Sequence, residues 1–251
     1  MALASERRRF ADQLTEAIRF RKAVLKLWAQ LPDDDIISLI KKARDNGNLN
    51  EAIWRIFLAA HFGRSSARGE QQIQSASRTL CAFRSTPFWT WKRISKNPEA
   101  FEEWLFSCRD ELASLRFGNH RKYESPRPEL ILETIESFVS LVGEYGSPKK
   151  LLGLEGDELD GFDVLYKRFR PIKRFGRTGY FDFLVLLLDI ELISVEPQRC
   201  YLRGATGPRK GAKLLWGGRK PSLLESKAEE LAVGLGVSAI AVEDALCNWQ
   251  K

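Results

Sequence analysis

Four short segments of the chain combine glycines, charged side chains and aromatic rings in ways that could support chemistry. The first, residues 116–124, holds an amide, an imidazole, two cations, a phenol and a carboxylate in six consecutive positions. These groups belong to Asn119, His120, Arg121, Lys122, Tyr123 and Glu124. A plain linker does not require them, so the segment is either a binding site or a polar, solvated turn that caps a helix.

The second segment, residues 175–182, is a glycine-flanked start of an apolar helix. Backbone N–H groups at the start of a helix attract anions, so we predict that they hold a phosphate together with Arg177 and Thr178. Asp182 falls in the first turn of the helix expected here. It either stabilises the helix dipole or belongs to the site.

The third segment, residues 201–215, has glycines that suit a short turn between two helices. Such a helix-hairpin-helix element directs backbone N–H groups at a DNA phosphate, and glycine permits the close approach. The residues that would make this contact are Gly204, Gly207, Arg209, Lys210, Gly211 and Lys213. The first two glycines are three positions apart rather than the usual two. No strand precedes them, which excludes the glycine-rich loops of nucleotide-binding proteins.

The fourth segment is residues 242–251, at the end of the sequence. An apolar face that runs from Val237 to Leu246 predicts that this end docks against the rest of the protein. Glu243 and Asp244 project about 100° apart around a helix, so only one of them can face a pocket. We favour Asp244, and the alternative is a solvated surface acid.

The positive charge of the chain is concentrated in one region. The chain has 40 Lys and Arg against 33 Asp and Glu, which gives a formal net charge of +7. Residues 170–220 include eleven basic and four acidic residues, which accounts for the whole excess, and no acid lies between Pro197 and Pro221. Uncompensated cations interleaved with glycines suit a polyanion such as a DNA backbone. The alternative is a basic face that meets only solvent.

Composition and spacing then define the elements that must position these groups. Hydrophobic residues are 44% of the 251 and recur with helical spacing, so we predict an all-α fold, a helical bundle in two lobes. The expected helices are 11–31, 33–43, 49–62, 99–115, 128–142, 160–169, 180–192, 223–235 and 238–249. We expect Ser238 to cap the last helix. The aromatic residues expected in the core are Trp28, Trp54, Phe57 and Trp104.

Several classes of protein are excluded at this point. No apolar run reaches the roughly 18 residues that span a membrane, and no secretory signal pattern begins the sequence. Four scattered cysteines and two histidines argue against a zinc site or an iron–sulfur cluster. We therefore expect a soluble, cytoplasmic protein with reduced thiols, no bound metal and no cofactor.

Four strings within the segments described above resemble one protein family. They are FGNHRKYE, FGRT..FD, GATGP..GA..LL and EDALCNWQK. Together they resemble the third clade of the alpha-glutamyl/putrescinyl thymine pyrophosphorylases, over residues 58–251. That family is associated with hypermodified thymines in phage DNA and is similar to helix-hairpin-helix DNA glycosylases, including antiphage enzymes. The resemblance implies a helix-hairpin-helix glycosylase-like fold, with an N-terminal helical region at residues 1–62 and a catalytic domain at residues 63–251. The alternative is one continuous domain.

The resemblance implies a monomeric DNA glycosylase that flips a hydroxymethylated or glucosylated pyrimidine out of double-stranded phage DNA and releases it, in antiviral defence. Asp244 would stabilise the sugar cation as the bond breaks, with Asp182 as a second catalytic candidate. The implied base pocket is Asn119, His120, Tyr123, Glu124 and Trp249. The implied DNA contacts are Arg121, Lys122, Arg177, Thr178, Gly204, Gly207, Arg209, Lys210, Gly211 and Lys213.

Two alternatives stay open. In the first, the protein is a transferase, and an amine such as putrescine or glutamate displaces pyrophosphate from pyrophosphorylated hydroxymethyl-uracil in DNA. Arg121, Lys122 and Arg177 would neutralise the leaving pyrophosphate, and Asp182 or Glu124 would deprotonate the amine. In the second, the protein is a non-catalytic DNA-binding module.

Overall fold

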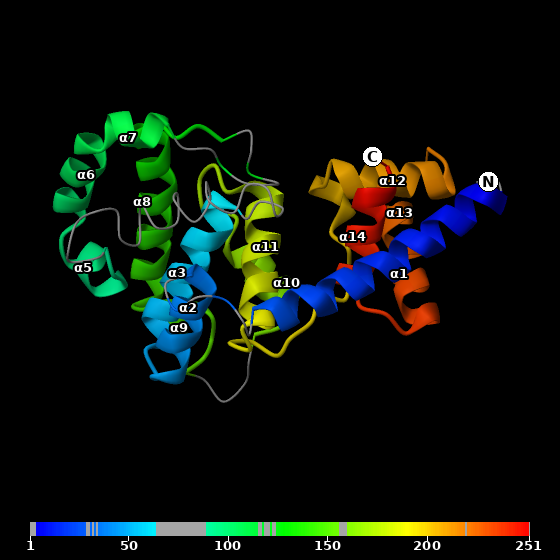
Figure 1. Ribbon diagram of the computed structural model, residues 1–251, viewed down its shortest axis with the longest axis horizontal. Helices are drawn as coiled ribbons and strands as arrows, with labels where there is room; N and C mark the ends of the chain where they lie inside the picture. Colours follow the sequence, from blue (N-terminus) through cyan, green and yellow to red (C-terminus); the bar gives the residue numbers. More distant parts are fainter. Residues whose placement is uncertain are drawn as a thin grey trace. The chain divides into compact units, whose positions relative to one another are not determined.

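The described part of the chain is helical and contains no strand in this computed structural model (Figure 1). The structure describes residues 4–28, 31, 33, 35–63, 89–114, 117, 121, 124–155, 160–218 and 220–250. None of the helices in these ranges combines the length and the apolar character needed to cross a membrane. The predicted all-α fold class is confirmed, whereas its helix-hairpin-helix detail stays a prediction.

Contacts between residues divide the chain into two compact units. Unit 1 combines Met1–Gln30 with Glu196–Lys251 and contains α1 (Ala4–Leu27), η2 (Leu202–Gly204), α12 (Gly207–Trp216), α13 (Pro221–Leu235) and α14 (Ala239–Trp249). Unit 2 is Leu31–Val195 and contains α2 (Ile36–Asp45), α3 (Leu49–Phe62), α5 (Trp91–Lys96), α6 (Pro98–Ser107), α7 (Arg109–Ala113), α8 (Pro128–Tyr145), α9 (Pro148–Leu151), α10 (Phe162–Arg168) and α11 (Gly176–Asp189).

The grouping by contacts differs from the domain boundary expected at residue 62. Helix α1 belongs to the same compact unit as the last helices of the chain, and α2 and α3 belong to the other unit. The expected catalytic domain of residues 63–251 is a functional assignment and stays a prediction.

Unit 2 is built around α3, which is apolar on nearly every side. Residues 51–62 are buried except for Arg55. The ring of Phe57 stacks on that of Phe138 from α8, with centroids 3.9 Å apart, and Phe183 from α11 meets both rings edge-on. Trp54 is also buried, as the helical spacing predicts. This aromatic core joins α3, α8 and α11, and it thereby fixes the helix ends at which polar residues gather.

Several helix boundaries differ from the expectation, and two of the differences are the most consequential. The helix expected at residues 99–115 is interrupted at Cys108, where α6 ends and α7 begins. Helix α11 begins at Gly176, four residues earlier than expected. Asp182 therefore lies in the second turn of α11, where stabilisation of the helix dipole is weaker than in the first.

In unit 1, the end of the chain docks as predicted. Helix α14 packs against both α1 and α12 (Figure 1). The ring of Trp249 meets that of Phe10 in α1 edge-on at 5.7 Å, and the core continues through Leu14, Ala17 and Leu246. The expected cap is also confirmed, because Ser238 Oγ accepts a hydrogen bond from the Ala241 N–H at 3.2 Å.

Gly207 and Gly211 bring the backbone of α12 into contact with α14. A Cβ atom on Gly211 would collide with the carbonyl oxygen of Leu246, and one on Gly207 would lie 2.8 Å from Cys247 Sγ. The sequence interpretation placed both glycines in a turn that meets a DNA phosphate. The structure places Gly207 at the first position of α12 and Gly211 within that helix, and the missing side chains permit a close crossing of two helices. Only Gly204, at the end of η2, lies in a turn-like element and is exposed.

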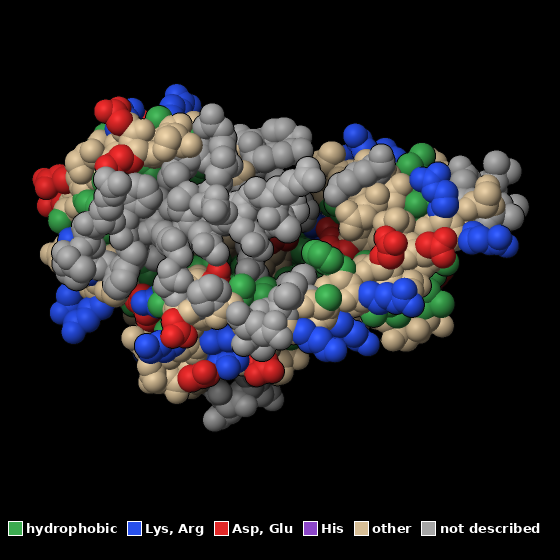
Figure 2. Space-filling view, viewed as in Figure 1, with side chains coloured by type: hydrophobic (Ala, Val, Ile, Leu, Met, Phe, Trp, Pro, Cys, Tyr) green, Lys and Arg blue, Asp and Glu red, His purple; other side chains and the backbone are tan. Residues whose placement is uncertain are grey.

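Helix α1 presents a mixed-charge face. Figure 2 shows both acidic and basic side chains along it. Arg9, Asp12, Glu16 and Arg19 are among its exposed residues. This face therefore lacks the single sign of charge that residues 197–220 carry.

We predict that Gly211→Ala destabilises the protein by about 2 kcal/mol, because the added methyl group forces α12 away from α14. Gly234→Ala is the matched control: Gly234 lies in α13 with open space around it, and the substitution should stabilise the protein by about 0.5 kcal/mol. Urea unfolding of the three proteins measures both effects. Equal stability of the two variants would contradict the packing argument.

Candidate functional site

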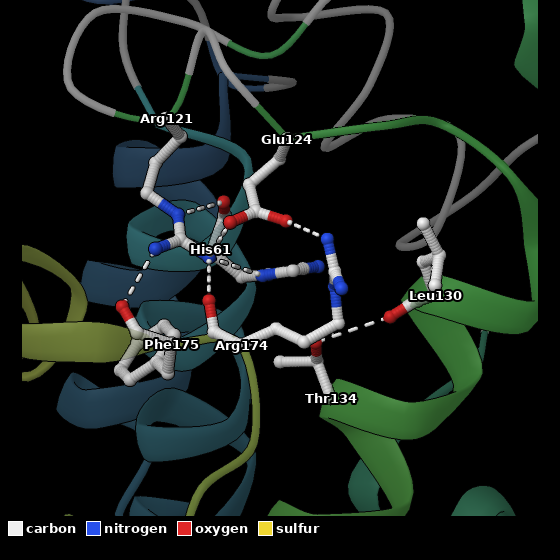
Figure 3. A network of polar contacts seen from close by, with 7 residues as sticks. All are labelled: His61, Arg121, Glu124, Leu130, Thr134, Arg174 and Phe175. Carbon is white, nitrogen blue, oxygen red and sulfur yellow. Dashed lines mark hydrogen bonds and ion pairs between the residues drawn. The ribbon is translucent and has the colours of Figure 1, made fainter.

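Polar and charged residues from distant parts of unit 2 gather beside the start of α11. We call this group the arginine cluster. It consists of His61, Arg121, Glu124 and Arg174, which Figure 3 shows, together with Asp182, which acts on Arg121 through its charge. It brings together the first two sequence segments, 116–124 and 175–182, and adds the end of α3. Neither His61 nor Arg174 was predicted. The only sequence signal for His61 was a titratable residue in an otherwise apolar stretch of helix.

Arg121 is the centre of the arginine cluster, and its side chain is only 5% exposed. Its Nε donates to the carbonyl oxygen of His61 at 3.1 Å, its Nη1 to that of Phe175 at 2.6 Å, and its Nη2 to that of Arg174 at 2.9 Å. Three backbone carbonyls from two distant segments thus share one guanidinium. Arg121 therefore links the end of α3 to the start of α11. Its predicted contact with DNA stays a prediction.

The counter-charge of the arginine cluster comes from two acids. Glu124 Oε2 pairs with Arg174 Nη2 at 3.1 Å, and Glu124 Oε1 lies 3.6 Å from Arg121 Nη2. Burial lowers the pKa of Arg121, and the negative charges of Glu124 and Asp182 oppose that effect. Asp182 therefore acts on Arg121 electrostatically. Its predicted catalytic role has no test here.

His61 is buried between the two arginines and is 1% exposed. Its Nδ1 lies 3.4 Å from Arg121 Nη2, and its buried Nε2 has no hydrogen-bond partner within the described ranges. Burial, and after it the positive charges of Arg121 and Arg174, lower the pKa of His61 well below 6.5. The imidazole is therefore neutral at physiological pH.

The start of α11 has an unusual backbone. Arg174 and Gly176 have φ angles of 56° and 61°, on either side of the helical Phe175, and no side chain caps the helix. Arg177 lies over the Phe181 ring at 4.3 Å, and Thr178 is half-buried. Successive N–H groups in such a turn form a concave surface that suits an anion. The predicted phosphate contact of Arg177 and Thr178 is compatible with this geometry and stays a prediction.

Unit 1 contains the second group of candidate residues. Helix α12 buries one face, which includes Gly211 and Leu215, in the core of the unit. Lys210 and Lys213 are exposed on the other face, and Arg209 is half-buried. The helix thus presents basic side chains to solvent, in a stretch of sequence without acids.

The acids of α14 differ in burial. Glu243 is 6% exposed and Asp244 is half-buried. Helical spacing places Glu243 on the same stripe as Leu246 and Cys247, the two residues that meet the glycines of α12. Asp244 lies on the neighbouring side of the helix. Either acid is close in sequence to the α12 contact, and the preference for Asp244 stays a prediction.

Trp249, a predicted base-pocket residue, is 6% exposed and belongs to the core of unit 1. One edge lines a shallow pocket of about 280 Å³ with Arg9, Asp12, Gln13 and Asn248. The Trp249 ring packs on Phe10 in the core. This packing leaves little of the ring exposed for a base to stack on.

Four predicted site residues lie outside the described residues: Asn119, His120, Lys122 and Tyr123. Their predicted roles therefore have no structural description.

Comparison with known protein families identifies the chain. Residues 7–251 match the family described as alpha-glutamyl/putrescinyl thymine pyrophosphorylase clade 3. The chain belongs to this family, as its four strings predict. Neither the curated proteins nor the solved structures contain a match to the chain. The family's description names an enzyme, and the glycosylase similarity rests on the sequence interpretation alone.

We predict that Arg121→Lys destabilises the protein by about 3 kcal/mol, because an ammonium group cannot reach three carbonyls arranged around a planar fork. Arg170→Lys is the matched control, since Arg170 is exposed in the same unit, and it should change stability by less than about 0.5 kcal/mol. Thermal or urea unfolding measures both variants. A stable Arg121→Lys variant would show that the three hydrogen bonds contribute little.

We also predict that His61 makes stability depend on pH. The unfolded chain binds a proton near pH 6.5 and the folded protein does not, so stability falls as the pH drops below about 6.5. The slope attributable to His61 should approach about 1.4 kcal/mol for each pH unit. His61→Phe should remove that part of the slope, whatever its effect on absolute stability. Urea unfolding between pH 5 and 7.5 measures the difference, and identical slopes would contradict the prediction.

Proposed function

We propose that this protein is a DNA glycosylase that removes a bulky modified pyrimidine, hydroxymethylated or glucosylated, from phage DNA and leaves an abasic site. The observation that carries the proposal is the crossing of α12 and α14 in unit 1. It joins a helix with exposed lysines to a helix with two adjacent acids. A glycosylase requires this combination, because it must hold a DNA backbone and place a carboxylate near the sugar.

The first step is binding to the DNA backbone. Lys210 and Lys213 are exposed on α12, and Arg203 is exposed on the preceding η2. Because no acid lies between Pro197 and Pro221, the segment itself supplies no negative charge that would repel phosphate. Backbone contacts of this kind release counterions, so affinity for DNA should fall steeply with salt.

The second step is chemistry on an extruded nucleotide. Flipping costs a few kcal/mol, which phosphate contacts on either side offset. Asp244 stabilises the positive charge that develops on the sugar as the N-glycosidic bond breaks, and water then adds to the sugar. The half-buried position of Asp244 is compatible with both solvent access and an orienting contact. Glu243, which is more deeply buried, is the alternative carboxylate.

The predicted base contacts Asn119, His120 and Tyr123 adjoin the arginine cluster in sequence. Arg121 and Glu124 are held by α3 and by the start of α11. Two of the six functional positions in this segment are therefore anchored. A rigid anchor supports specificity, because a base pocket on fixed positions discriminates between bases better than one on an unanchored loop.

A transferase is the second candidate, and the family's description favours it because that description names a pyrophosphorylase. In this reaction the nitrogen of an amine bonds to the methylene carbon of the modified thymine, the carbon–oxygen bond breaks, and pyrophosphate leaves. Asp182 or Glu124 would accept the amine proton, and Arg177 would neutralise the pyrophosphate. The start of α11 supports an anion in that place.

We further propose that the protein works as a monomer in the cytoplasm, in defence against phages whose DNA carries modified bases. Neither enzyme reading requires a metal or a cofactor. A non-catalytic DNA-binding role is the remaining alternative.

The experiment is incubation with duplexes that carry hydroxymethylated or glucosylated pyrimidines, followed by mass spectrometry of the released small molecules. A glycosylase releases free base without any added amine. We expect Asp244→Asn to lower this rate by about 100-fold or more, with DNA affinity retained, and Glu243→Gln to be the matched comparison. A parallel duplex carries pyrophosphorylated hydroxymethyl-uracil, and release of pyrophosphate from it that depends on an added amine would instead identify the transferase. DNA binding without either product would identify the non-catalytic module.

A further inference from the structure

An acid from α13 holds the turn that leads into the basic segment of unit 1. Glu225 Oε2 accepts a hydrogen bond from the Leu202 N–H at 2.6 Å. The backbone N–H groups of Cys200 and Tyr201 also favour the charged form of the Glu225 carboxyl, whose buried Oε1 has no hydrogen-bond partner among the described residues. The carboxylate thus lies against a turn whose bonded residue, Leu202, is 23 positions earlier in the chain.

The turn does not follow from local preference. Tyr201 has φ 52° and ψ 44°, the left-handed region that residues with a side chain rarely adopt. Backbone N–H groups in such a turn form a concave anion site. Glu225 supplies the anion from within the protein, so the carboxylate stabilises a backbone shape that the sequence alone disfavours.

Glu225 lies in an environment that disfavours its charged form. Burial raises the pKa of Glu225, and the backbone N–H groups of residues 200–202 oppose that effect without cancelling it. A carboxylate that only needed to be solvated would lie elsewhere on the surface. Its half-buried place under the turn indicates that the contact with the turn is specific.

The segment that follows this turn carries the DNA-binding residues proposed above. Leu202 and Ala205 are buried and anchor η2, whereas Arg203 between them is exposed. Arg209 Nη1 donates to the Arg203 carbonyl oxygen at 3.4 Å, which ties η2 to the first turn of α12. The position of the turn at Tyr201 therefore sets the positions of both arginines.

We infer that Glu225 is a positioning residue for DNA binding: it fixes the Cys200–Leu202 turn and so sets where Arg203 and the first turn of α12 meet a phosphate. This inference rests on the proposed binding of DNA by the basic segment. It concerns an acid, which by charge alone would repel DNA.

The charge of Glu225 and its contact with the turn predict opposite effects on DNA binding, so one substitution can distinguish them. Removing a negative charge near a DNA-binding surface should strengthen binding if charge is all that matters. Removing the carboxylate that shapes the surface should weaken it. Glu230 is the matched control, because it is an exposed acid on the same helix. Glu225→Gln and Glu230→Gln change the net charge equally and differ only in the contact with the turn.

The experiment measures the binding of a fluorescent 20-base-pair duplex by anisotropy from about 0.05 to 0.3 M salt, with unfolding curves for every variant. We expect Glu230→Gln to bind as tightly as the unmodified protein or slightly more tightly. We expect Glu225→Gln to bind roughly tenfold more weakly at 0.1 M salt, with a salt slope reduced by about 1, as for one lost phosphate contact. If Glu225→Gln does not fold, Glu225→Asp replaces it. The shorter side chain keeps the charge but moves the carboxylate away from the turn, so weaker binding than that of Glu230→Gln is again expected.

A double-mutant cycle separates positioning from general loss of stability. If Glu225 acts through Arg203, then Arg203→Gln weakens binding in the unmodified protein and has little further effect in the Glu225→Gln variant. Additive losses, or Glu225→Gln binding as tightly as Glu230→Gln, would overturn the inference and leave the proposed DNA binding intact. Absence of binding by the unmodified protein at the lowest salt would overturn both.

Discussion

The contact between α12 and α14 is the constraint on which unit 1 depends. Two helices can cross at backbone distance only where at least one of them lacks a side chain at the contact, and Gly207 and Gly211 provide that gap on α12. Because one face of α12 is committed to this crossing, its basic residues must occupy the opposite face. The same contact brings the helix with Glu243 and Asp244 beside the helix with Lys210 and Lys213. The same glycine contact thus determines both the packing of unit 1 and which of its basic and acidic residues lie near each other.

The four family strings separate into two pairs that different interactions hold together. The first two meet in unit 2, where the guanidinium of Arg121 binds carbonyls of His61, Arg174 and Phe175. The last two meet in unit 1 through direct contact between helix backbones. A buried charge with several acceptors specifies one arrangement because any other leaves it without partners. A glycine contact specifies one arrangement because any added atom prevents it. The acids on which the two enzyme readings rely, Asp244 and Asp182, belong to different pairs.

Local patterns predicted the helices well where the apolar spacing was strong. The bounds expected for α3 are those observed, and Ser238 caps α14 as its position before an apolar helix suggests. The prediction was weaker where glycine lay inside a helix: Gly211 was expected to contact a DNA phosphate as part of a helix-hairpin-helix element, whereas it lies within α12. Asp182 was assigned to a first turn because the helix start at Gly176, with its positive φ, has no apolar periodicity to reveal it.

By itself, the sequence determined the fold class, the aromatic core, the family and the concentration of positive charge in residues 170–220, since each depends on residue type and on spacing along the chain. Tertiary structure alone decided that Arg121 is a buried link rather than an exposed cation, that His61 lies between two arginines, and that Glu225 shapes a turn of disfavoured backbone. These three outcomes depend on contacts between residues at least 23 positions apart in the chain. The spacing of apolar residues along the chain does not predict such contacts, because the free energy that selects them comes from desolvation and hydrogen bonding in the assembled core.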